Sequence, residues 1–250
     1  MLPERKYVMS IAGFDPSGGA GLLADIKTFE QHKVHGLSVS TATTLQTENK
    51  FYSIQWADLK EVINAVDVLM NSYPLQVIKI GIVPSFDFLS QLVMHIKNKN
   101  ATIKIIIDPI IKSTTGFDFQ KEIPEEKLIS VLSTIFLLTP NVEEAMFLSN
   151  NTDVETAANK LSKYCNVLLK GGHHKTSIGV DYLYSENTCV ELKPTFHNLS
   201  AKHGSGCVLS AAIASNLALG FDLKTSCIHA KNYVERFLSS SNSLLGYHHV

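Results

Sequence analysis

Short runs of β-branched and other apolar residues alternate with amphipathic segments along most of this chain. We expect strands at the apolar runs, which cover residues 7–12, 37–42, 76–81, 102–108, 135–139 and 166–170. Most of these runs lack polar alternation, which is typical of strands buried on both faces. We expect helices at the amphipathic segments, which cover residues 21–33, 57–70, 85–97, 142–149 and 154–163. This alternation predicts an α/β fold, with a mainly parallel central sheet flanked by helices on both faces.

The rhythm changes near residue 177. Two β-prone runs flank Ser185-Glu186-Asn187, which predicts an antiparallel hairpin over residues 178–193. Two further helices are expected at 206–219 and 222–240, and Thr152 or Asp153 is the expected N-cap of the helix at 154–163. Because the chain has no internal repeat, low-complexity linker or Pro/Gly-rich hinge, we expect a single domain over residues 1–250.

Composition argues against several classes of function. Lys and Arg number 22 and Asp and Glu number 23, so the chain lacks the basic excess that nucleic acid or an anionic membrane requires. The four cysteines form no CxxC pair, which argues against common zinc and dithiol sites and indicates a reduced, cytoplasmic protein. No targeting segment is expected at the N-terminus. Residues 204–221 carry no charged side chain, but their Ala, Gly and Ser content predicts a buried helix rather than a membrane span.

The first unusual loop follows the first expected strand and reads Gly13-Phe14-Asp15-Pro16-Ser17-Gly18-Gly19-Ala20-Gly21. Ligands bind at the carboxyl ends of strands in open parallel sheets, so this is a candidate binding loop. It lacks the GxGxxG spacing of a dinucleotide site and the Lys of a P-loop. Two interpretations stay open, namely a ligand-binding loop and a tight turn between strand and helix.

A second glycine-rich site, His203-Gly204-Ser205-Gly206-Cys207, precedes an apolar helix. The N–H groups at such a helix start, together with the positive end of the helix dipole, favour an anion such as phosphate. Cys207 falls in the first turn, where we expect the pKa of its thiol to be lowered. The alternative is a buried structural cysteine, but the neighbouring glycines favour a functional site.

A third site lies at Asn141 and Glu144, which are three residues apart and therefore share one helix face. An amide and a carboxylate oxygen suit Mg²⁺, usually through water. The alternative is an N-cap Asn followed by acids that compensate the helix dipole, and both interpretations can hold at once. Asp108 ends another strand and is a further metal candidate, while Lys170 ends a strand where it could contact a phosphate. These are the parts that phosphoryl transfer needs.

At these residues the sequence resembles the hydroxymethylpyrimidine/phosphomethylpyrimidine kinase family of thiamine biosynthesis, a branch of the ribokinase-like superfamily. The matching segments are residues 11–29, 41–46, 79–81, 108–109, 138–145, 169–173 and 203–212. The resemblance implies a ribokinase-like fold and ATP-dependent phosphorylation of 4-amino-5-hydroxymethyl-2-methylpyrimidine, and then of its monophosphate. It further implies ATP as co-substrate, Mg²⁺ as cofactor and a homodimer.

The resemblance also implies roles for single residues. Gln46 would hydrogen-bond the aminopyrimidine, since its amide carries both a donor and an acceptor. The other implied substrate-binding positions are Gly13, Asp25 and Ile82. Cys207 matches the catalytic position, and the anion hole would be formed by Gly204, Ser205 and Gly206. ATP and magnesium would be held by Lys170, Asn141, Glu144 and Asp108, with the metal bound through water.

The sequence departs from the family pattern at a few positions. Ile82 stands where Met is frequent, Ser205 replaces Thr, and Ala201-Lys202 replaces Asn-Thr. The run Thr114-Thr115-Gly116, with Lys112 before it, replaces Lys-Ser-Gly in a segment that could act as a lid.

Two alternative functions stay open: a pyridoxal kinase of the same fold, and a catalytically silent nucleotide-binding module. Gln46 favours the aminopyrimidine over pyridoxal. The joint presence of Cys207, Asn141, Glu144 and Lys170 argues against the silent module.

Overall fold

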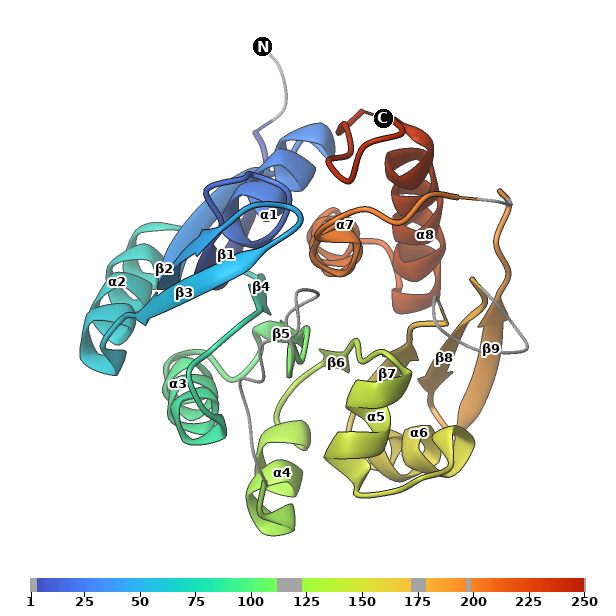
Figure 1. Ribbon diagram of the computed structural model, residues 1–250. Coiled ribbons are helices and arrows are strands. Elements are labelled where there is room, and N and C mark those ends of the chain that lie inside the picture. Colours follow the sequence, from blue (N-terminus) through green and yellow to red (C-terminus); the bar gives the residue numbers. More distant parts are fainter. Residues whose placement is uncertain (1–3, 112–122, 172–178, 197–198, 250) are drawn as a thin grey trace.

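The computed structural model describes residues 4–111, 123–171, 179–196 and 199–249. Within these residues one mixed sheet has the strand order β3-β2-β1-β4-β5-β6-β7-β8-β9 (Figure 1). The strands are β1 (Tyr7–Phe14), β2 (His35–Gln46), β3 (Phe51–Trp56), β4 (Val77–Ile80), β5 (Lys104–Ile107), β6 (Leu137–Leu138), β7 (Asn166–Leu169), β8 (Asp181–Ser185) and β9 (Thr188–Leu192). Strands β2, β1, β4, β5, β6 and β7 are parallel, while β3, β8 and β9 join at the edges as antiparallel strands.

Helices cover both faces of this sheet, as the sequence predicted. They are α1 (Gly21–Gln31), α2 (Leu59–Ser72), α3 (Phe86–Lys99), α4 (Glu125–Leu132), α5 (Val142–Ser149), α6 (Val154–Ser162), α7 (Ser205–Ala218) and α8 (Leu223–Ser239). Helices α1, α7 and α8 pack on one face, and α2 to α6 pack on the other (Figure 1). Among the described residues, no helix has the length and apolar character that crossing a membrane requires.

The apolar strands have no polar face because successive side chains enter different cores. In β5, Ile105 and Ile107 face the α2–α6 side, whereas Ile106 faces α1, α7 and α8. This follows from the two-residue period of a strand. Helix α7 is buried almost all round, which confirms that its uncharged sequence encodes a core helix.

Three details differ from the sequence predictions. Strand β2 extends four residues past the expected end at 42, and β3 was not expected at all. Residues 51–56 form an edge strand with no fully buried side chain, so their apolar signal is weak. The eight-residue helix α4 was also not expected.

The predicted hairpin is confirmed as β8–β9, and its expected first residue, 178, lies outside the described residues. Asp153 is the N-cap of α6, because its carboxylate accepts from Thr156 N.

Strand β1 lies between β2 and β4. The chain adds β2 and β3 on one side of β1 and then crosses over to add β4 on the other side. Ligands of open α/β sheets bind at such a switch point, outside the carboxyl ends of the strands. A ligand site is therefore expected among the residues that follow β1, β2, β4 and β5.

Candidate active site

A cavity of about 700 Å³ opens at the carboxyl ends of the strands. It brings together residues that are up to about two hundred positions apart in the sequence. The predicted site residues that line it are Gly13, Gln46, Ile82, Asp108, Asn141, Glu144, Lys170, Gly204, Ser205, Gly206 and Cys207. Of the predicted site residues, Asp25 alone is not among its lining residues.

One wall of the cavity is apolar and close-packed. A Cβ atom at Gly13 would lie 2.9 Å from Ile82 Cγ2, so glycine is needed for Ile82 to reach this wall. Thr41 Oγ1 donates to Ile82 O at 2.7 Å and fixes the segment after β4. Gln46 is the half-buried last residue of β2 and pairs with Phe51 of β3. Its amide is a polar group that β2 supplies to the cavity, together with the hydroxyl of Thr44.

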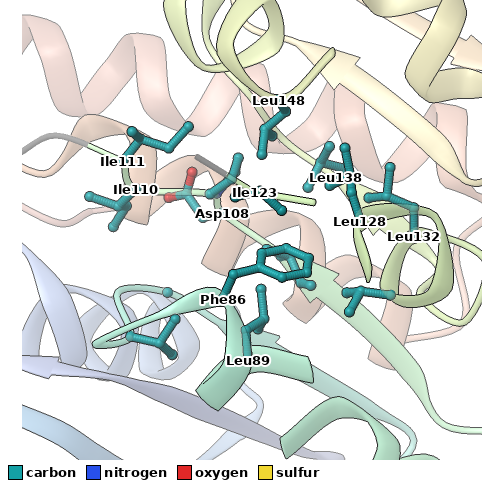
Figure 2. Close-up of a pocket in the computed structure, with 15 residues that line it drawn as sticks. Phe86, Leu89, Asp108, Ile110, Ile111, Ile123, Leu128, Leu132, Leu138 and Leu148 are labelled. Carbon is teal, nitrogen blue, oxygen red and sulfur yellow. The ribbon is translucent and has the colours of Figure 1, made fainter. Parts of the chain in front are cut away.

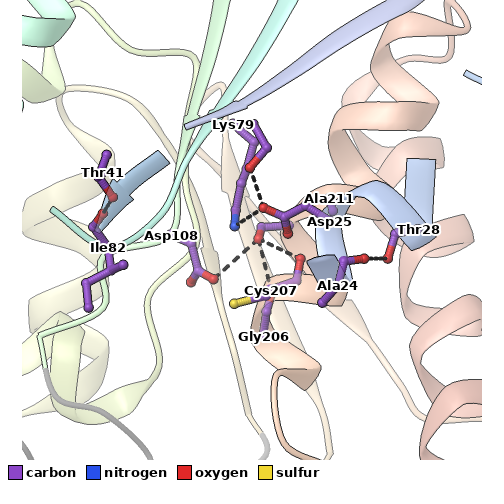
Figure 3. A network of polar contacts seen from close by, with 12 residues as sticks. Ala24, Asp25, Thr28, Thr41, Lys79, Ile82, Asp108, Gly206, Cys207 and Ala211 are labelled. Atoms are coloured by element: carbon purple, nitrogen blue, oxygen red, sulfur yellow. Dashed lines mark hydrogen bonds and ion pairs between the residues drawn. The ribbon is translucent and has the colours of Figure 1, made fainter. Parts of the chain in front are cut away.

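The prediction that Asp25 contacts the substrate was wrong, because the structure places Asp25 below the cavity rather than in its wall. Its side chain is fully buried, accepts from Ser10 Oγ at 2.5 Å and pairs with Lys79 Nζ at 2.8 Å (Figure 3). A carboxylate in that position cannot contact a ligand directly. It supports the charged floor of the site instead.

The predicted anion hole is the first turn of α7. Gly204 is the N-cap with φ of 77°, and a Cβ there would lie 2.0 Å from Gly19 O. Glycine is therefore required both by the backbone angle and by the close approach. Ser205, Gly206 and Cys207 are the first three residues of the helix, where N–H groups have no acceptor within the helix. The N–H of Ser205 donates to Lys202 O, outside the helix, at 3.4 Å.

The thiol of Cys207 does not behave as the sequence predicted. Burial is the largest influence and raises its pKa to about 11, and the charges of Asp25 and Asp108 act in the same direction. Lys79 and the backbone of Gly21 oppose this shift without cancelling it. The expectation of a lowered pKa was wrong because desolvation of the thiolate outweighs the helix dipole.

Lys170 forms ion pairs with two acidic residues, Asp108 and Glu144. Its Nζ lies 2.8 Å from Asp108 Oδ1 and 3.7 Å from Glu144 Oε2. Burial opposes charge on Asp108, but Lys170 and Lys79 outweigh it and lower the pKa of Asp108. For Glu144 burial prevails and raises the pKa. The cluster of Asp108, Glu144 and Lys170 has one negative charge in excess when all three are ionised.

Asn141 and Glu144 form a capping box at the start of α5, which confirms the capping interpretation. Asn141 Oδ1 accepts from Glu144 N at 2.9 Å, and Glu144 Oε2 accepts from Asn141 N at 2.7 Å. Strands β6 and β7 bring this box to Lys170, since Asn141 and Lys170 form an isolated parallel bridge. Within the described ranges no group of three His, Cys, Asp or Glu side chains could hold a metal by itself.

Three polar residues of the site were not singled out from the sequence. Lys79 lies in β4 among Val77, Ile78 and Ile80, and a single charge inside a buried strand was the available signal. Asp15 and His203, from the two glycine-rich loops, pair at 2.9 Å, which only the folded chain reveals.

Parts of the predicted site fall outside the described residues. They are Lys112, Thr114, Thr115 and Gly116 of the expected lid segment, and Gly172 and His173 after Lys170.

A second cavity lies beside Asp108 and holds about 30 Å³ (Figure 2). Its labelled walls are almost wholly apolar, with side chains such as Phe86, Leu89 and Leu128. That volume accommodates little more than one water molecule, so it is a packing gap under the site rather than a ligand pocket.

Comparison with known proteins places these features in context. The family model described as phosphomethylpyrimidine kinase matches residues 15–250. A hydroxymethylpyrimidine/phosphomethylpyrimidine kinase of Aquifex aeolicus (strain VF5) is 32% identical over 244 residues, with 94% of this chain and 95% of that protein covered.

Two solved structures have the same fold. A phosphomethylpyrimidine kinase from Clostridium difficile 630 is 29% identical with a TM-score of 0.77, and the match covers 92% of this chain and 98% of the other. An ADP complex of a pyridoxal kinase from Bacillus subtilis is 26% identical with a TM-score of 0.83, covering 96% and 94%.

Proposed function

Because this chain belongs to the phosphomethylpyrimidine kinase family, we propose that it phosphorylates 4-amino-5-hydroxymethyl-2-methylpyrimidine with ATP, and then phosphorylates the resulting monophosphate. The observation that carries the proposal is that one cavity holds Cys207, the start of α7 and the Lys170 cluster. These supply a base, an anion hole and a cation, which are the groups that phosphoryl transfer requires.

The phosphates of ATP are assigned to the start of α7 and to Lys170. The N–H groups of Gly206 and Cys207, together with the Ser205 N–H that is only loosely bonded to Lys202 O, stabilise negative charge on the transferred phosphoryl group. Lys170 is fixed by Asp108 and Glu144, so its ammonium group is in place before the nucleotide binds. Both groups act by position and charge, without covalent chemistry of their own.

The residues also fit Mg²⁺. Asp108 and Glu144 carry hard carboxylate oxygens, and their excess negative charge beside Lys170 suits a hydrated dication. Asn141 adds an amide oxygen, although that atom caps α5. We assign these three residues to hold the ion through water, where it would neutralise charge on the triphosphate.

In the first reaction the nucleophile is an alcohol, whose proton has to leave as oxygen bonds to phosphorus. Cys207 is the proposed base. Since burial keeps its pKa near 11, the thiolate is a minor form in the unliganded protein at neutral pH. Lys79 and the backbone of Gly21 favour this thiolate. The first step should therefore accelerate as pH rises.

In the second reaction the nucleophile is a phosphate oxygen. A phosphate monoester has its second pKa near 6 and is already ionised at neutral pH. The second step consequently needs no base, and Cys207 should contribute to it mainly through packing and its backbone N–H.

Mass spectrometry of the products tests this function. The protein is incubated with the pyrimidine, ATP and Mg²⁺, and we expect the monophosphate first and the diphosphate later. A reaction without Mg²⁺ and one with the Cys207→Ala variant serve as controls. Failure to form either product would contradict the proposal.

A pyridoxal kinase is the second candidate, supported by the fold shared with the Bacillus subtilis pyridoxal kinase. The Gln46 amide in the cavity favours an aminopyrimidine, which presents a ring nitrogen beside an amino group. Competition between the two substrates decides: we expect a higher kcat/KM for the pyrimidine. A preference for pyridoxal would reverse the assignment.

A homodimer and a cytoplasmic location are also proposed. Family membership supports the homodimer, and the four free cysteines support the cytoplasmic location. Light scattering on the purified protein measures the first, and fractionation of cells measures the second.

A further inference from the structure

The two glycine-rich loops, residues 13–21 and 202–206, interlock in the structure although they are about 190 positions apart. Gly204 packs so closely on Gly19 that any Cβ would lie 2.0 Å from Gly19 O. A Cβ on Gly19 would in turn meet His203 Cδ2 at 2.7 Å. The contact leaves no room for a ligand between the loops at this point.

A side-chain hydrogen bond between Asp15 and His203 crosses this contact. His203 Nε2 and Asp15 Oδ2 lie 2.9 Å apart, and the two side chains are only 6% and 2% exposed. Burial opposes charge on Asp15, but hydrogen bonds with His203 and Ser17 prevail and lower the pKa of Asp15. The bond is buried away from water, and a satisfied polar pair in that environment holds its two residues rigidly in one arrangement.

Asp15 also organises its own loop. Its carboxylate accepts from Ser17 N at 2.9 Å, from Ser17 Oγ at 2.8 Å and from Ala20 N at 2.9 Å. Ala20 is the N-cap of α1, and Gly21 is its first residue. The Asp15 carboxylate thus bonds both to its own loop and to His203, the residue before Gly204.

The interlock reaches the proposed base from both sides. Gly204, the N-cap of α7, packs on Gly19 and Ala20 of the first loop, and the backbone of the next residue, Gly21, lowers the pKa of the Cys207 thiol. His203 is covalently next to Gly204, the N-cap of α7, and its own N–H donates to Leu244 O at 2.9 Å. A shift of either loop would displace the sulfur relative to the anion hole.

We propose that Asp15 and His203 are a pair of positioning residues, which lock the first glycine-rich loop against the start of α7 and thereby align Cys207 and the anion hole. The catalytic roles of the aligned groups, a base and an anion hole, rest on the proposed function. In this proposal residues 15–21 act as a brace for the reacting centre, while Asp15, Ala20 and Gly21 also line the cavity. Asp15 pairs with Nε2 of His203, and this bond connects the imidazole to the first loop.

The test compares Asp15→Ala, His203→Ala and the double variant with the wild-type protein. We expect each single variant to lose about 10- to 100-fold in kcat for the pyrimidine, because small misplacements of reacting groups cost that much. KM for ATP should change less than threefold. The double variant should be no worse than the poorer single variant, since both break one bond. His203→Gln should recover much of kcat, because its amide N–H can reach Asp15.

The matched control is His95→Ala. His95 Nε2 pairs with Asp67 Oδ1 at 2.8 Å, but this pair lies on the surface with both side chains 33% exposed. Its loss should leave kcat unchanged. Thermal melts verify that each variant is folded at the assay temperature. If His203→Ala does not fold, His203→Leu replaces it, with the same loss of kcat expected, because leucine fills the space without a donor for Asp15.

A second readout does not depend on turnover. The rate of Cys207 alkylation by iodoacetamide, followed by peptide mass spectrometry, should change at least threefold in Asp15→Ala and His203→Ala. Folded variants with wild-type kcat and wild-type alkylation, or single effects that multiply in the double variant, would overturn the inference. A wild-type protein that forms no pyrimidine phosphate would contradict the proposed function instead, and alkylation would still decide the positioning role.

Discussion

Lys79 Nζ lies 2.8 Å from Asp25 Oδ2 beneath the active-site cavity, and both side chains are completely excluded from solvent. Burial opposes charge on Lys79, but Asp25, Cys207 and Asp108 outweigh it and raise its pKa. Asp25 Oδ1 has no hydrogen-bond partner among the described residues. Burial also raises the pKa of Asp25, although Lys79 opposes this shift. The pair therefore places a positive and a negative charge together below the proposed base, with one carboxylate oxygen unsatisfied.

Lys79→Met should strongly destabilise the protein. Removing one member of a buried ion pair leaves the other charge unpaired, which costs about 3–5 kcal/mol. Urea unfolding followed by circular dichroism measures the change. Lys127→Met is the control, because the Lys127–Asp87 pair is exposed and should contribute less than about 1 kcal/mol. Equal effects of the two substitutions would contradict the buried charge pair as the cause.

Cys207→Ala should separate the two proposed reactions. We expect phosphorylation of the alcohol to fall about 10²–10⁴-fold, as is usual when a general base is removed. Phosphorylation of the monophosphate should fall less than tenfold, since its nucleophile is already ionised. Single-turnover assays with each substrate measure both steps, with Cys189→Ala as the control because Cys189 is exposed. Equal losses in both steps would show that Cys207 is not acting as a base.

The pH dependence of Cys207 alkylation tests the raised pKa of the thiol. A raised pKa means that the reactive thiolate is scarce near neutral pH and accumulates as pH increases. In the unliganded protein, the iodoacetamide rate at Cys207 should keep rising above pH 8.5, toward the pKa of about 11. Peptide mass spectrometry assigns the label to Cys207. A plateau below pH 8.5 would mean that the helix dipole, rather than burial, controls the thiol.

Gln46→Leu should weaken pyrimidine binding while sparing ATP. An unpaired ring group in the occupied site would cost about 1–3 kcal/mol, which corresponds to about 5- to 150-fold in Kd. Isothermal calorimetry with each ligand measures the effect. Gln55→Leu on the neighbouring strand β3 is a suitable control, because Gln55 is exposed. Unchanged pyrimidine affinity would remove Gln46 as the group that reads the substrate.

Glu144→Gln should raise the Mg²⁺ concentration needed for half-maximal rate. Glutamine can replace glutamate in a capping box, so the start of α5 should survive while the charge is lost. Glu143→Gln is the control, since Glu143 is the exposed preceding residue in the same helical turn. Mg²⁺ titrations of initial rate that overlay for wild type and Glu144→Gln would limit Glu144 to capping.

The parallel sheet and most helix positions were readable from the sequence because their cause is local. Apolar runs such as β5 and amphipathic segments such as α3 carry the periods of two and 3.6 residues that burial imposes. Helix α5 begins at Val142 as predicted, since Asn141 caps it. The edge strand β3 was missed because a half-exposed strand has little apolar signal.

The sequence by itself determined which residues are chemically able to serve the site, and the order of strands placed them at one edge of the sheet. The tertiary structure alone decided their electrostatic state and their partners. Burial reversed the expected pKa shift of Cys207. Asp25, which was expected to contact the substrate, instead pairs with Lys79. Desolvation and ion pairing depend on every neighbour in space, and those neighbours, such as Asp15 and His203, are far apart in the chain.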